Sequence, residues 1–368
     1  MSTKTELVLL GTAGGPRPSR ERHGVASALV LGDRVLLVDA GRDACTQYHT
    51  AHLRYAALSD IFVTHLHSDH ICGLFDFFQL ASFVPAKDPL SQTVRVYGPG
   101  SAGQLPATSP VPSGAAPRDA ASVPVLCEHN PVPGLREYLD LQVAAAAYDI
   151  NVRMRCSGVP DLRELMAVHE IAVPDVGADP RIEVAPLMEP FLVSEDDDVR
   201  VTAILVNHPQ TFPSFGFRFD TPGGSVVFAG DTTAHPNVVT LARSADVLVL
   251  SPMYQEFFAS RDSVHSDYMR EIHISAADAG DVARAAGVGA LVLTHLAPSD
   301  PALVTDDQWR NAVADRFDGP VVVGADLMPI DVSAIAADRR GEYAAAAVSA
   351  TRLAGLVPGQ GEQLHPGP

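Results

Sequence analysis

Histidine and aspartate side chains are concentrated in one short stretch, where His65, His67, Asp69 and His70 directly follow the apolar run 61–63. A strand that ends in such a cluster directs several polar side chains into one small space. Neutral imidazole and carboxylate are ligands that suit zinc, and a bound zinc ion can bring the pKa of a water molecule close to neutrality. The stretch therefore predicts a metal-dependent hydrolase.

Histidine-rich tracts also occur in solvated loops and in purification tags. A tag lies at a chain terminus, with no buried strand before it and no helix after it. Here the cluster lies inside the chain, and the apolar segment 71–80 that follows it predicts a largely buried helix. This context favours a metal site over both alternatives.

Other apolar segments of the chain also end in potential metal ligands. The ligands that follow them are His208, Asp231 and His295. A single histidine after a strand is commonly a structural hydrogen-bonding residue, but packing alone does not explain a series of such strand ends. If the ends converge, five histidines and two aspartates are available, which is enough for two metal ions and an open position for water.

The motif His-x-His-x-Asp-His at 65–70, followed at this spacing by His208, Asp231 and His295, resembles the metallo-β-lactamase superfamily. The resemblance implies an α/β fold, an αββα sandwich with two zinc ions at one edge. It implies one ion held by His65, His67 and His208, a second held by Asp69, His70 and His295, and Asp231 as the bridge. A hydroxide that bridges the ions is then the nucleophile, and Asp69 also accepts a proton. The ligand types permit Mn²⁺ or Fe²⁺ as well.

Further segments resemble the ribonuclease Z and arylsulfatase-like branch of this superfamily, among them 10–16, 97–99 and the motif His273-x-Ser275. In that branch the position of His273 implies contact with the scissile phosphate and proton donation to the leaving group, roles that suit an imidazole beside two cations. The alternative for His273 is an exposed residue before a helix. Ribonuclease Z proteins tend to carry a His-Glu pair where this chain has Ser251-Pro252, which argues against tRNA maturation.

Strand-like runs and turns alternate over residues 1–97 and 199–330, and the resemblance implies that these residues form a metallo-β-lactamase-like core. A stretch rich in Pro, Gly, Ser and Ala is followed by helical patterns, which predicts that 98–190 is a partly helical insertion that covers the active site. Residues 331–368 are expected to form a C-terminal helix, at 344–356, and a loose tail.

Within the insertion, 161–169 has a helical pattern, and Arg153 and Arg155 alternate along a predicted strand or helix edge. Guanidinium groups bind anions through paired hydrogen bonds, so both arginines are candidate substrate-binding residues. The alternative is a surface ion pair with a neighbour such as Asp149. Outside the insertion, Asp39 ends a predicted strand and is expected to orient a metal-bound imidazole, with a turn cap as the alternative.

The composition of the chain narrows the class of partner. Its 368 residues include 44 acidic and 26 basic ones and carry a formal charge of −18. Structured nucleic acid requires many cationic contacts to phosphate, so it is a poor candidate partner and a small molecule is expected. The sequence contains no run of eighteen apolar residues, so no membrane span is expected. The four cysteines lack CxxC spacing and predict free thiols in a cytoplasmic protein. A homodimer through a hydrophobic insertion is a further option.

The expected function is that of a binuclear zinc hydrolase that acts on a small phosphodiester, sulfate or ester substrate. A lactonase or carboxylesterase of the same fold is a second enzyme class that these residues permit, and a tRNA 3′-processing endonuclease is a weaker alternative. A non-catalytic module that keeps metals for its shape is the remaining alternative, although the complete ligand set argues against it.

Overall fold

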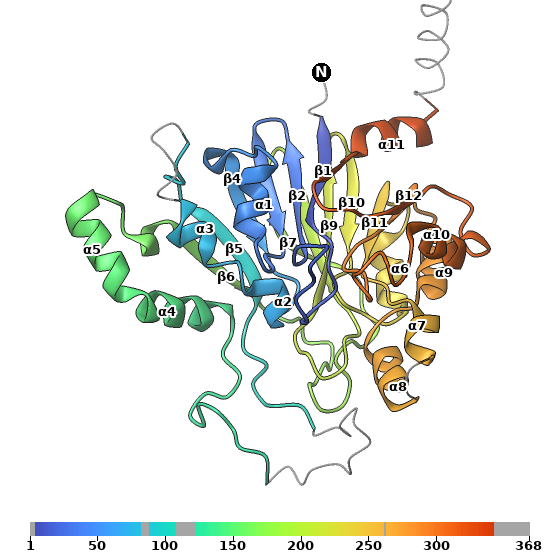
Figure 1. Cartoon of the computed structure of the whole chain (residues 1–368), viewed down its shortest axis with the longest axis horizontal. Helices are drawn as coiled ribbons and strands as arrows, with labels where there is room; N and C mark the ends of the chain where they lie inside the picture. The colour runs from blue at the N-terminus through green and yellow to red at the C-terminus, as the bar shows by residue number, and fades with distance from the viewer. Residues whose placement is uncertain (1–3, 82–87, 108–121, 261–262, 342–368) are drawn as a thin grey trace, which may run out of the picture.

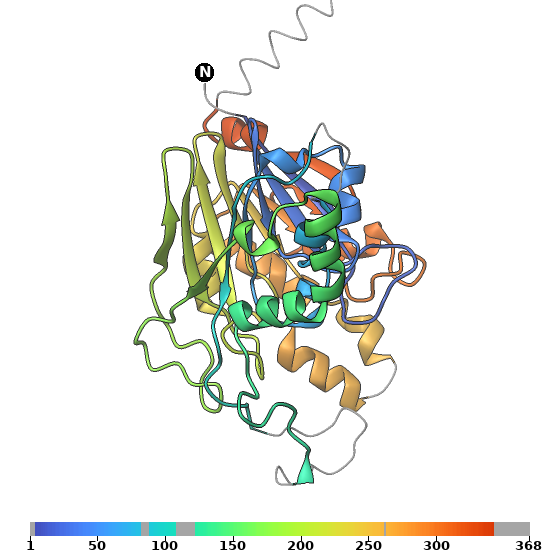
Figure 2. The same cartoon turned by 90° about the vertical axis from the view of Figure 1, so that its left-hand side faces the viewer.

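The fold is a sandwich of two β-sheets with helices on both outer faces, as Figure 1 and Figure 2 show. The computed structural model describes residues 4–81, 88–107, 122–260 and 263–341. Each sheet has seven strands, and separate apolar clusters lie between the sheets and beneath the helices of each outer face. The αββα arrangement expected from the sequence is therefore confirmed.

The first sheet has the strand order β14-β1-β2-β3-β4-β5-β6. Its members are β1 (Thr5–Gly11), β2 (Ala26–Leu31), β3 (Arg34–Val38), β4 (Leu58–Phe62), β5 (Val94–Pro99), β6 (Met166–Ile171) and β14 (Met328–Asp331). Strands β3 to β6 run parallel, and the other neighbours pair antiparallel. The β2–β3 hairpin turns at Gly32, whose φ of 60° is a conformation that glycine adopts without strain.

The second sheet has the strand order β13-β12-β11-β10-β9-β8-β7. Its members are β7 (Phe191–Glu195), β8 (Arg200–Leu205), β9 (Phe215–Thr221), β10 (Gly224–Phe228), β11 (Val247–Leu250), β12 (Ala290–Leu293) and β13 (Val321–Val323). Strands β10 to β13 are parallel, and β8 points the same way because both β8 and β10 pair antiparallel with β9. The carboxyl ends of β8, β10 and β12 therefore lie at one edge.

The inner layer of the sandwich is made of large apolar side chains that alternate with outward-facing ones along each strand. Phe62, Phe217 and Phe219 are almost completely buried between the sheets, and the ring of Phe62 lies edge-on at 5.0 Å from the ring of Phe219. Its neighbour Ile61 points to the opposite face and packs beneath the helices. This period of two is typical of a strand that is covered on both faces.

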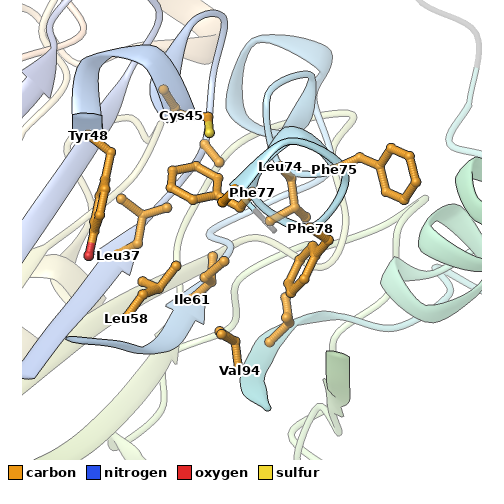
Figure 3. Packing of buried hydrophobic residues seen from close by; sticks show 14 of the residues in the cluster. Leu37, Cys45, Tyr48, Leu58, Ile61, Leu74, Phe75, Phe77, Phe78 and Val94 are labelled. Atoms are coloured by element: carbon orange, nitrogen blue, oxygen red, sulfur yellow. The ribbon is translucent and has the colours of Figure 1, made fainter. Parts of the chain in front are cut away.

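Figure 3 shows the apolar layer on the outer face of the first sheet, where Tyr48, Phe77 and Phe78 pack on strand residues such as Leu58. These rings come from α1 (Ala44–Thr50) and α3 (Asp76–Gln79). The prediction of one helix over 71–80 is wrong, because a turn separates α2 (Ser68–Ile71) from α3. In this turn the backbone of Gly73 donates a hydrogen bond to the carbonyl of Ala40, and a Cβ at Gly73 would collide with the Gly41 carbonyl.

Helices of the C-terminal half cover the second sheet. The helices packed on its outer face are α6 (Pro236–Ala242), α9 (Ala276–Ala286) and α10 (Asp306–Ala314), whereas α7 (Gln255–Ala259) and α8 (Ser263–Ile272) pack on each other beyond the strands, as Figure 1 shows. Ser275 caps the N-terminus of α9, since its side chain accepts a hydrogen bond from the backbone N–H of Asp278. The cap fixes the start of α9 shortly after the end of α8.

The segment between β5 and β7 contributes both an exposed helical pair and a strand. Helices α4 (Leu135–Ala145) and α5 (Ala147–Ser157) form a unit that we call the arm, followed by the short 3-10 helix Leu162–Glu164. The prediction of a helix over 161–169 is wrong, because β6 pairs in parallel with β5 and its hydrogen bonds to that strand override local helix propensity. The boundary of the insertion at 98–190 stays a prediction.

The described chain ends with β14 and α11 (Val332–Arg339). Near the other end, a single-turn 3-10 helix, Tyr55–Ala57, precedes β4. The predicted helix at 344–356 lies outside the described residues. Within the described ranges, no helix has the length and apolar character that crossing a membrane requires.

Candidate active site

Four strand ends meet at one edge of the sandwich and bring together all seven predicted metal ligands. The first group is formed by His65 and His67, which follow β4, and by His208, which follows β8. His67 Nδ1 lies 3.0 Å from His65 Nε2 and 3.3 Å from His208 Nε2, so three ring nitrogens face one small volume. A group of three imidazole nitrogens at this separation suits a divalent cation.

The second group joins α2 to the end of β12. His295 Nε2 lies 3.1 Å from Asp69 Oδ2, and His70 Nε2 lies 3.7 Å from the same oxygen. These atoms all lie within 4.8 Å of one another. The group therefore offers two nitrogens and one carboxylate oxygen. We call it the mixed group, and we call His65, His67 and His208 the histidine-only group.

Asp231 follows β10 and lies between the two groups. Its Oδ2 atom is 3.6 Å from His70 Nε2 and 3.5 Å from His295 Nε2. Asp231 and His70 also form a third candidate metal-binding group with His65. His65 is a member of the first group as well. One carboxylate is thus adjacent to ligands of both groups, as the predicted bridging position requires.

Two buried atoms of this cluster test whether the residues fit a cation. Among the described residues, Asp231 Oδ1 and His70 Nε2 are buried and have no hydrogen-bond partner. A buried polar atom without a partner is costly in a folded protein. Coordination of a divalent cation would satisfy both atoms, so the donor set and its burial fit a metal site.

Burial controls the charge of the histidine-only group. It lowers the pKa of His65 well below the usual value for histidine, and it lowers the pKa of His208 to about 3. Both rings are therefore neutral at physiological pH. A neutral imidazole presents the lone pair that binds a cation, whereas a protonated ring does not.

Charge has the opposite effect in the mixed group. Burial disfavours the charged imidazole of His70, but the nearby carboxylates of Asp39 and Asp231 outweigh it and raise the pKa of His70. Burial alone would raise the pKa of Asp231, but His295 and His70 hold it well below its usual range. Asp231 is therefore an anion, which is the form that binds a cation.

Asp39 orients ligands of both groups. It accepts a hydrogen bond from His70 Nδ1 at 2.8 Å, and it accepts one from the Thr64 hydroxyl at 2.9 Å. Thr64 Oγ1 in turn lies 3.1 Å from Nδ1 of His65. The hydrogen bond expected between Asp39 and a predicted ligand histidine is present, and it reaches a second ligand through Thr64.

Two further orienting contacts were not predicted from the sequence. His208 Nδ1 donates a hydrogen bond to the carbonyl of Ile272 at 3.1 Å, and His67 Nε2 lies 2.9 Å from Thr211 Oγ1. A backbone carbonyl leaves no signal in a sequence. Thr211 is three residues from His208, but nothing in that spacing indicates contact with His67, which comes from the other sheet.

His273 lies beside the cluster, directly after α8. Its side chain is 9% exposed, and its Nδ1 atom is 3.8 Å from Asp231 Oδ2. Its ring centre is 5.7 Å from that of His208 and 6.0 Å from that of His295. The alternative of an exposed residue before a helix is therefore wrong, whereas the catalytic role of His273 stays a prediction.

The two arginines predicted to bind substrate are not brought to this cluster. Arg153 and Arg155 lie on α5, which Figure 1 places at the outer end of the molecule, away from α2. Arg153 Nε is 2.7 Å from Asp149 Oδ2 on the same helix, and Arg155 is exposed. This is the local surface ion pair that the sequence offered as the alternative.

Comparisons with known proteins agree on the fold and on one group of relatives. The family model described as a beta-lactamase superfamily domain matches residues 99–296, and one described as anti-Pycsar protein Apyc1 matches residues 5–93. Ribonuclease Z of Mycobacterium marinum is 30% identical over 331 residues, which cover 89% of this chain and 99% of that protein.

Two solved structures resemble the chain along most of their length. The short form of human tRNase Z aligns with a TM-score of 0.56 and 21% identity, covering 89% of this chain and 99% of that chain. The metallo-beta-lactamase fold protein YhfI from Bacillus subtilis aligns with the same TM-score and coverage at 18% identity. At these identities the two structures support the fold alone.

Proposed function

The chain belongs to the metallo-β-lactamase superfamily, in its ribonuclease Z-like branch, and on this premise we propose that it is a binuclear zinc phosphodiesterase. It is a metal-dependent hydrolase, as the family and its ribonuclease Z relatives indicate. Zinc as the metal, two as the number of ions and a small phosphodiester as the substrate are our proposal.

The observation that carries the proposal is one carboxylate adjacent to two ligand groups. Asp231 Oδ2 lies close to His70 and His295, and Asp231 forms a further group with His65. Two divalent cations held there would neutralise developing negative charge and bring the pKa of a water molecule near neutrality. A carboxylate placed between the two groups also reduces the repulsion between two cations.

The side chains around the cluster would move the protons of the reaction. We assign to Asp69 the acceptance of the proton that the attacking water loses. As the water oxygen bonds to phosphorus and the bond to the leaving oxygen breaks, His273 in its imidazolium form donates a proton to that oxygen and is left as neutral imidazole. The burial of His273 beside Asp231 supports this role, because it holds the ring against the reacting centre.

A second candidate function is cleavage of RNA. It is favoured by curated relatives named ribonuclease Z, which align over 89% of this chain and nearly their own full length. The formal charge of −18 argues against a polyanionic partner, and so does the Ser251-Pro252 sequence. We therefore rank a small phosphodiester first and an RNA end second.

The test measures bound metal and turnover together on purified protein. We expect about two zinc ions per chain by mass spectrometry of the metals, hydrolysis of bis(p-nitrophenyl) phosphate, and loss of both after chelation. Slow turnover of p-nitrophenyl acetate, a lactone and p-nitrophenyl sulfate would agree with the proposal. Precursor tRNA cleaved faster than the small diester would favour the second candidate, and full turnover without bound metal would contradict both.

The role of His273 is tested with leaving groups of different basicity. A phenolate leaving group needs protonation more than p-nitrophenolate does, so His273→Asn should slow the phenyl diester by about 10²-fold or more and the p-nitrophenyl diester much less. Metal content should not change. Equal losses on both diesters would show that His273 positions other groups and does not act as the acid.

We also propose a reducing, cytoplasmic location. Cys45, Cys72, Cys127 and Cys156 form no disulfide with one another, and three of them are exposed, as is usual for proteins kept in a reducing compartment. Labelling of three thiols under native conditions, without prior reduction, would support this location. A homodimer stays a prediction.

A further inference from the structure

The loop between β1 and β2 is fixed at one end against the metal-binding residues. Gly14 N donates a hydrogen bond to the Leu296 carbonyl at 3.1 Å, and Gly15 N lies 3.4 Å from His295 Nε2. A side chain at Gly15 would collide with the carboxylate of Asp69. The loop backbone therefore lies directly on two predicted ligands of the mixed group.

The other end of the loop is held by a buried arginine. Arg22 is 9% exposed, and its guanidinium donates hydrogen bonds to Thr12 Oγ1 at 2.7 Å and to the Ser299 carbonyl at 3.0 Å. Arg42 adds a hydrogen bond from Nη2 to the Ser19 carbonyl at 3.2 Å. Both ends of the tip, residues 16–20, are thus attached to the core.

The tip presents two arginines that are exposed and have no hydrogen bond or ion pair within the described part of the chain, Arg17 and Arg20. Proline on both sides of Arg17 restricts the backbone at 16 and 18. The nearby carboxylate of Asp43 is already engaged, by Arg42 at 2.5 Å and by His23 at 3.0 Å. The guanidinium groups of Arg17 and Arg20 are therefore available to an anion.

Position gives these arginines access to the substrate. Arg17 is two residues from Gly15, so the two Cα atoms are separated by at most about 7.6 Å. Gly15 lies against Asp69, so the backbone of Arg17 is held close to the metal-binding residues, and Arg20 follows Ser19, whose carbonyl is held by Arg42. We propose that Arg17 and Arg20 form an anion subsite that binds a second phosphate of the substrate, next to the phosphodiester that is cleaved.

This inference rests on the proposed phosphodiesterase function and narrows its substrate class. The scissile phosphodiester would be neutralised by the cations, which leaves the guanidinium groups for a neighbouring anion. Arginine is suited to this role, because its planar fork donates two parallel hydrogen bonds to phosphate oxygens. The preferred substrates are then small phosphodiesters that carry an additional phosphate, rather than neutral esters or simple diesters.

The kinetic test uses two substrates that differ in one phosphate. These are the p-nitrophenyl ester of thymidine 5′-phosphate and its 3′-phosphorylated analogue. Arg17→Ala combined with Arg20→Ala should raise KM for the 3′-phosphorylated substrate about tenfold, a typical loss for one charge-assisted pair, with kcat and the other substrate nearly unchanged. Arg17→Lys with Arg20→Lys should recover part of the loss, and Arg54→Ala serves as an exposed-arginine control.

A binding measurement separates this inference from the proposed function. Calorimetry on the zinc-loaded protein compares thymidine 3′,5′-bisphosphate with thymidine 5′-monophosphate. Tighter binding of the bisphosphate that disappears in the double alanine variant supports the subsite, even if neither ester is hydrolysed and the phosphodiesterase proposal fails. Equal binding of the two nucleotides by the wild type, or a preference that survives the double substitution, overturns the subsite.

Discussion

The metal-binding edge and the arm differ in what surrounds their charged side chains. At the edge, Asp231 and His295 are 2% exposed and their partners come from distant segments of the chain. On the arm, Asp149 and Arg153 are 41% and 42% exposed and pair four residues apart on one helix. A buried cluster of charge is costly unless it binds something, whereas an exposed local pair contributes little either way. Function is therefore expected at the edge.

The largest effect is expected at the residue adjacent to both ligand groups. Asp231→Asn keeps the shape of the side chain but removes the charge, so metal content should fall and turnover should drop by about 10³-fold, equivalent to several kcal/mol of lost metal assistance. Metal analysis and initial rates on the same preparation measure both quantities. The matched control is Asp149→Asn on the arm, which should change neither. Retention of two metal ions and normal turnover by the Asp231 variant would remove the distinction between the two regions.

A smaller loss is expected from the residue that orients ligands without binding metal. The Asp39 carboxylate accepts hydrogen bonds from His70 Nδ1, from the Thr64 backbone N–H and from the Thr64 hydroxyl. In Asp39→Asn only one side-chain oxygen remains to accept them. Metal affinity should decrease by about 10- to 100-fold, measured by competition with a chromogenic chelator. Because Asp39 reaches His65 through Thr64, both ions should bind more weakly. Loss of one ion only would show that the Thr64 contact has no effect on the first group.

The edge could be predicted from the sequence because its signals are local to each strand. An apolar run followed by His65, His208, Asp231 or His295 indicates a strand end, and parallel strands place such ends together. The pairing of the two sheets then follows from the resemblance of the whole motif to a known superfamily. At these positions the same residues mark the ends of the strands and supply the metal ligands. The pattern of strand ends therefore predicts both the fold and the metal site.

The segment between β5 and β7 and the contacts that the Ile272 carbonyl and Thr211 make with ligand histidines could not be predicted in this way. The helical pattern at 161–169 is wrong because β6 gains its stability from pairing with β5, which no window of local sequence contains. Thr211 approaches His67 only because the two sheets pack face to face. Arg153 and Arg155 have the right chemistry for an anion, but their distance from α2 is a property of the tertiary fold.

Thr211 allows a finer test of the edge. Thr211→Val keeps the shape of the side chain and removes the oxygen 2.9 Å from His67 Nε2. Since His67 is the exposed member of its group, loss of this contact should weaken metal binding by about tenfold, whereas Thr211→Ser should restore it. The chelator competition used for Asp39 measures the change. Equal affinity in the valine and serine variants would show that packing alone orients His67.

The smallest effect is expected on the arm itself. Arg153→Ala combined with Arg155→Ala removes one exposed pair four residues apart, so the free energy of unfolding should change by less than about 0.5 kcal/mol. Turnover and KM should stay at wild-type values for singly and doubly phosphorylated substrates, because α5 lies away from the ligand groups. Denaturant unfolding and the nitrophenyl assay measure the two quantities. A raised KM would instead mean that the arm approaches the edge during turnover, which would return both arginines to the substrate-binding role that the sequence predicted.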